Sequence, residues 1–142
     1  MIEQDSKGTI CFVSLEIYPT TAGGVGILLH HTISFLLDQG YNIVLLLDIP
    51  NHEFDQYRYK DRMSLSNGGN LTVHSVRGLT DQITFPNAAI PHSEMLRSAR
   101  IAKALEQLCT RYPIDMIEFY DYCGPAYYFL GAHLESLSLI HI

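Results

Sequence analysis

Two short segments of the sequence carry residue types suited to ligand binding or catalysis. The first, residues 16–26, contains Gly23, Gly24 and Gly26. Glycines let a backbone approach a ligand closely, and the N–H groups that begin a helix favour a phosphate or another anion. The same glycines would also serve a tight turn and close packing of a helix on a sheet. Their spacing leaves both interpretations open.

The second segment, residues 115–124, groups Glu118, Tyr120 and Asp121 near the end of an apolar run. Acidic and phenolic groups are costly to bury without partners, so we expect them to face a cleft. The structural alternative is that Asp121 only caps the helix that follows.

The elements around the first segment form a βαβ unit. Residues 9–15 and 42–48 are nearly continuous apolar runs, which is typical of strands buried on both faces of a parallel sheet. Apolar residues recur at helical spacing between them, and Gly40 follows where a helix C-cap is expected. The crossover between neighbouring strands should be right-handed.

The rest of the chain continues the same alternation. We expect an irregular polar excursion, a third strand, a long helix that ends at Pro113, a fourth strand, a further helix opened by Gly124 and Pro125, and a final segment compatible with a fifth strand. The excursion covers residues 50–70, the third strand residues 71–76 and the long helix residues 93–112. The fourth strand covers residues 115–120, and the final segment covers residues 134–142.

This plan predicts an α/β fold with a doubly wound, mostly parallel, Rossmann-like sheet. With the strand order 3-2-1-4, the first and fourth strands are neighbours about 4.8 Å apart. The two polar segments would then meet at the topological switch point, where open α/β sheets bind ligands.

A dinucleotide-binding oxidoreductase is an alternative function. Gly24 and Gly26 begin like the glycine fingerprint, and Asp48 ends the second strand where a ribose-binding acid would lie. However, Leu29 stands where the third glycine is expected, and Gly23 comes eight positions after Leu15 instead of directly after the strand.

The composition is that of an ordinary globular domain. The 142 residues are 47% hydrophobic and 17% charged, and the net charge of −6 argues against nucleic acid as the main partner. We find no signal peptide or transmembrane segment, and the three cysteines fit no disulfide framework, so we predict a cytoplasmic protein. No metal site is predicted, because His30 and His31 would point about 100° apart on a helix.

The two segments together resemble the N-terminal domain of family 4-type glycosyltransferases, which have the two-domain GT-B fold. The resemblance rests on Glu16, Pro19, the run 23–26 and the run 115–124, and it covers residues 8–130. It implies retaining transfer of a sugar from a nucleotide-sugar donor to a sugar or glycolipid acceptor. No metal or other cofactor is implied.

The resemblance also implies roles for particular residues. Asp121 would be the catalytic group beside the reacting sugar. The backbone at Gly23, Gly24 and Gly26 would contact the donor phosphates, with further binding contacts from Glu16, Glu118 and Tyr120. Glu16 would either pin the glycine loop or touch the acceptor. Many relatives have a histidine at the position of Tyr120, which puts a histidine-assisted mechanism in doubt.

We interpret residues 1–142 as a single, partial domain that lacks the C-terminal donor-binding domain of such enzymes. Half a cleft cannot exclude water or position two substrates, so we expect the fragment to be inactive by itself. The segment at about residues 136–142 has no cap or turn, and we leave open whether it belongs to the native gene. A non-enzymatic nucleotide-binding module of the same topology is a further alternative.

Overall fold

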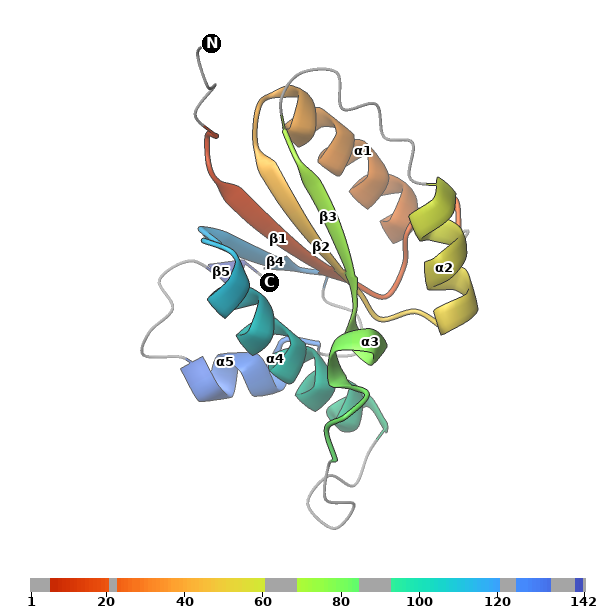
Figure 1. The fold of residues 1–142 in the computed structure, drawn as a ribbon, viewed down its shortest axis with the longest axis vertical. Coiled ribbons are helices and arrows are strands. Elements are labelled where there is room, and N and C mark those ends of the chain that lie inside the picture. Colours follow the sequence, from red (N-terminus) through yellow and green to blue (C-terminus); the bar gives the residue numbers. More distant parts are fainter. Residues whose placement is uncertain are drawn as a thin grey trace.

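The computed structural model describes residues 6–20, 23–60, 69–84, 93–120, 125–133 and 140–141. Its centre is a parallel sheet with the strand order β3-β2-β1-β4-β5 (Figure 1). The predicted α/β class, the parallel sheet and the order 3-2-1-4 are confirmed. The strands are β1 (Thr9–Ser14), β2 (Asn42–Leu47), β3 (Leu71–Ser75), β4 (Met116–Phe119) and the two-residue β5 (Ile140–His141).

Strand β1 lies in the middle of the sheet and pairs with β2 on one side and β4 on the other. In register, Val13 lies opposite Leu46 of β2 and Phe119 of β4. All six β1 residues are buried, as expected for a strand covered on both faces. The carboxyl ends of β2 and β4 therefore lie on either side of the carboxyl end of β1.

Helices cover both faces of the sheet. In Figure 1, α1 (Gly24–Asp38) and α2 (Asn51–Lys60) lie on one side, and α4 (Ser93–Arg111) and α5 (Tyr127–His133) lie on the other. The short helix α3 (Val76–Thr80) continues directly from β3 beside α4. Each face has its own apolar core: one centres on Leu29 and Ile33 of α1, the other on Ile101 and Leu105 of α4.

Helix α2 corrects the predicted irregular excursion over residues 50–70. Most of its residues are polar, so it lacks the apolar periodicity that marks a helix in a sequence. It is held by Tyr57, which is 3% exposed, and by Phe54 one turn earlier, both packed on the α1 side of the sheet. Residues 61–68 of the same stretch lie outside the described residues.

The packing of α1 makes a matched pair of stability predictions. Ile33 is fully buried, so Ile33→Ala should lower the free energy of unfolding by about 2–5 kcal/mol through lost burial and a cavity. Leu28 on the same helix is 58% exposed, and Leu28→Ala should change it by less than about 0.5 kcal/mol. Urea unfolding followed by circular dichroism measures both; equal losses would contradict this arrangement of α1.

Candidate functional site

The loop after β1 is held at its start by a buried serine. Ser14, 2% exposed, donates from Oγ to the Glu16 carbonyl oxygen at 2.7 Å and accepts from the Glu16 N–H at 3.1 Å. These two hydrogen bonds turn the chain directly at the strand end. They place Glu16 at the carboxyl edge of the sheet.

The Glu16 side chain lies against the N-terminus of α1. Its carboxylate occupies the space that a Cβ atom at Gly23 would need, and Gly23 is the N-cap residue of the helix. Its Oε2 is enclosed and has no hydrogen-bond partner among the described residues. Neither an acidic first-turn residue nor a side-chain cap is found in α1 itself. A carboxylate here complements the positive end of the helix dipole, which favours a pinning role for Glu16.

The three predicted glycines have different surroundings. Gly26 is buried, and a Cβ atom there would lie 3.1 Å from backbone atoms of Ile17 and Tyr18. Its carbonyl oxygen accepts from the Tyr18 N–H at 3.3 Å, so it joins the loop to the helix. Gly24 is exposed and has no neighbour within 4 Å of a Cβ position. Gly24 is therefore the glycine of the three that faces open space.

The end of β4 lies beside this loop, as the predicted strand order requires. The Tyr120 N–H donates to the Val13 carbonyl oxygen at 3.4 Å. Burial raises the pKa of the Tyr120 phenol, the Glu118 charge raises it further, and a hydrogen bond with Thr32 of α1 opposes both. Tyr120 therefore lies towards α1.

The predicted site residues are brought together in part. Glu16, Gly23, Gly24 and Tyr120 share one edge of the sheet, whereas Glu118 lies within β4, paired with Phe12 of β1. Asp121, the predicted catalytic residue, lies outside the described residues.

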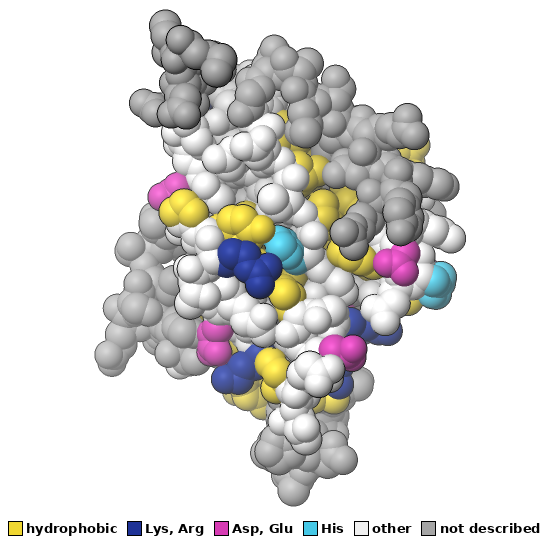
Figure 2. Space-filling model, viewed as in Figure 1, with side chains coloured by type: hydrophobic (Ala, Val, Ile, Leu, Met, Phe, Trp, Pro, Cys, Tyr) yellow, Lys and Arg dark blue, Asp and Glu magenta, His cyan; other side chains and the backbone are white. Residues whose placement is uncertain are grey.

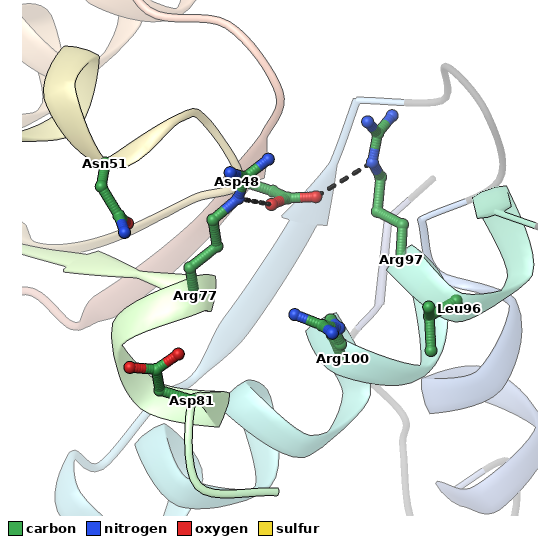
Figure 3. A pocket seen from close by; sticks show the side chains of 7 residues that line it. All are labelled: Asp48, Asn51, Arg77, Asp81, Leu96, Arg97 and Arg100. Carbon is green, nitrogen blue, oxygen red and sulfur yellow. Dashed lines mark ion pairs between the residues drawn. The ribbon is translucent and has the colours of Figure 1, made fainter. Parts of the chain in front are cut away.

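A second cluster at the same edge was not predicted. The Asp48 N–H donates to the Ser14 carbonyl oxygen at 3.0 Å, and the Asp48 carboxylate pairs with Arg97 of α4 at 3.0 Å and Arg77 of α3 at 3.9 Å (Figure 3). With Arg100 these residues line an open pocket of about 360 Å³. From the sequence alone, Asp48 is considered only as a ribose-binding acid. The spacing of Arg97 and Arg100, which places both on one helix face, is the signal for the arginines.

We found no match to this chain among protein families, curated proteins or solved structures. The described residues contain no group of three histidine, cysteine or acidic side chains placed to hold a metal ion. Within the same part of the chain, no helix is long and apolar enough to span a membrane.

The glycine surroundings predict opposite effects of one substitution. Gly26→Ala should lower the free energy of unfolding by about 1–3 kcal/mol, because the added methyl group meets the Ile17 and Tyr18 backbone. Gly24→Ala should leave it unchanged or raise it by up to about 1 kcal/mol, because alanine favours the helix and meets nothing. Denaturant unfolding of both variants is the measurement, and a larger loss for Gly24→Ala would refute these placements.

Asp48 gives a pH-dependent prediction. Burial raises the pKa of its carboxyl above the usual 3.8, and the charges of Arg97, Arg77 and Arg100 oppose this without reversing it. The folded state therefore binds the Asp48 proton more tightly than the unfolded chain does. The contribution of Asp48 to stability should be largest below pH 3.8 and should decline as the pH rises through the raised pKa.

The measurement is the free energy of unfolding of the wild type minus that of Asp48→Asn, between about pH 3 and about pH 7. This difference should fall as the pH rises. A difference that instead grew in favour of the wild type would mean that the arginine charges outweigh the cost of burial.

Proposed function

We propose that this chain is the acceptor-side half of a retaining glycosyltransferase, which moves a sugar from a nucleotide-sugar donor to a sugar or glycolipid acceptor. One observation supports this most strongly: β1 pairs directly with β4, so the loop carrying Glu16 and Gly24 begins beside Tyr120. Ligands of open α/β sheets bind at this kind of switch point.

The surroundings of the glycines refine the roles that this proposal assigns. Gly24 is the residue that a ligand can approach, because the space in front of it is open. Gly23 and Gly26 act indirectly: one accommodates the Glu16 carboxylate, and the other lets the loop pack against α1. Asp121, which follows Tyr120, remains the proposed group beside the reacting sugar.

Transfer itself requires more than this edge of the sheet. A reacting sugar must be held in line with its acceptor and shielded from water, and a single open edge does neither. The proposal therefore includes a second, donor-binding domain facing this edge, and it expects no turnover from residues 1–142 alone.

The dinucleotide alternative is less well supported. A ribose-binding acid must offer its carboxylate oxygens to the ribose hydroxyl groups. In this chain, Asp48 is the candidate acid, and its two oxygens are paired with Arg97 and Arg77. Occupation of both oxygens argues against a nicotinamide or flavin nucleotide at this position.

The binding part of the proposal is testable on the isolated chain. Uridine, guanosine and thymidine diphosphate sugars are titrated separately into the ¹⁵N-labelled protein. We expect at least one of them to shift the amide signals of residues 23–26 and Tyr120. The amide signals of Gly8 and Gly40 should not shift, because these residues lie at the amino ends of β1 and β2, on the far side of the sheet from the proposed site. Gly24→Val should weaken this binding about tenfold or more, because the new side chain fills the open space.

Gly131→Val is the matched control, since Gly131 of α5 also has open space at its Cβ position and lies on another helix. Its binding should equal that of the wild type. The proposal fails if none of these nucleotide sugars binds saturably, or if NAD⁺ or FAD shifts the same amides more strongly. Nucleotide binding with no sugar preference would instead favour a non-enzymatic binding module.

A further inference from the structure

Three arginines from two helices surround the pocket at the end of β2. Arg77 comes from α3, and Arg97 and Arg100 come from the first two turns of α4. Figure 3 shows the Arg100 guanidinium directed into the gap between α3 and α4, with Arg77 and Arg97 on either side of Asp48. These are three of the nine basic residues of a chain whose net charge is −6. Their concentration at one pocket is therefore not a consequence of a basic surface.

Asp48 does not use up the donors of this cluster. Both of its ion pairs are made to the Nε atoms of Arg77 and Arg97. A guanidinium carries five N–H donors, four of them on the two terminal nitrogens. Asp48 thus pairs with the Nε atom of each guanidinium group, and each group carries further donors on its two terminal nitrogens.

The remaining lining leaves the pocket positive and open to a ligand. Asp81 is the other acidic residue, and Figure 3 shows its carboxylate on the far side of the pocket from Arg97 and Arg100. The lining has three positive and two negative groups. The side chains of Arg77 and Arg97 are 47% and 39% exposed, so a solute reaches them without unfolding either helix. Over α3 in Figure 2, basic and acidic side chains lie next to each other at the surface.

We propose that this pocket binds the phosphate group of a small phosphorylated molecule. A phosphate dianion has enough acceptor oxygens for three guanidinium groups, whereas a carboxylate has two. A volume of about 360 Å³ also accommodates the group that carries the phosphate. Asn51, at the start of α2, lines the same pocket and offers an amide for that group. The site does not depend on the transferase proposal, because it involves neither the glycine loop nor Tyr120.

The test uses the full 142-residue chain and three probes at constant ionic strength: inorganic phosphate, glucose 6-phosphate and acetate. Binding is followed by NMR at the amides of α3 and α4 and at the arginine Nε–H signals. We expect saturable phosphate binding with a dissociation constant of about 1 mM or tighter. Glucose 6-phosphate should bind at least as tightly, and acetate about tenfold more weakly.

Four variants separate a binding site from a structural cluster. Arg77→Gln and Arg100→Gln should each weaken phosphate binding about tenfold. Lys103→Gln removes the same charge from α4 at a residue paired with Glu106 at 3.3 Å, outside the pocket, and should have less than a twofold effect. Asp81→Asn should strengthen binding about twofold, because a negative charge leaves the lining. Thermal unfolding of each variant confirms that it is folded.

The proposal is overturned if phosphate does not saturate these signals, if acetate binds as tightly as phosphate, or if Lys103→Gln weakens binding as much as Arg77→Gln. Weaker binding by folded Asp81→Asn would also overturn it. Phosphate binding here and nucleotide-sugar binding at Gly24 report on different amides, so the failure of one proposal is distinguishable from the failure of the other.

Discussion

The backbone pairing of β1 with both of its neighbours is the constraint on which the rest of the molecule depends. Ser14 accepts from the Asp48 N–H, and Val13 accepts from the Tyr120 N–H, so three strand ends are joined at one edge. Because parallel strands all end on the same side, every loop that follows them opens towards the same region. The glycine loop, the end of β4 and the arginine pocket are neighbours for this one reason.

The two central strands of the sheet, β1 and β2, were predictable because they are buried. Residues 43–47 of β2 are all apolar and buried, and burial on both faces leaves few other structures for such a run. Helices α2 and α3 were missed for a physical reason: α2 is anchored by Phe54 and Tyr57 in an otherwise polar segment, and α3 begins where β3 ends, with no turn residues between. Tertiary packing selects the helix in α2, whereas α3 is also favoured locally, because the Ser75 hydroxyl caps it by accepting from the Gly78 N–H at 3.2 Å.

The sequence predicted which residues of the candidate site lie near one another, but it did not predict what surrounds each of them. The sequence places Glu16 and Gly24 near Tyr120 once the strand order is assumed, and the structure confirms that order. It gives no indication that Gly24 is open while Gly26 is packed against the loop backbone. The complete arginine pocket could not be assembled from the sequence, because Arg77 and Arg97 are twenty positions apart and are brought together in the fold, where both pair with Asp48.

The position of the Glu16 carboxylate has a thermodynamic consequence. It lies against the first residues of a helix that has no acidic group of its own there, and such a charge is worth about 0.3–1 kcal/mol. An anion that approached the same backbone would compete with Glu16, and displacing the side chain would remove support from the first turn of α1. Anion binding at this edge and the order of the helix start are therefore coupled, and the free energy of that coupling is the same whichever of the two is measured.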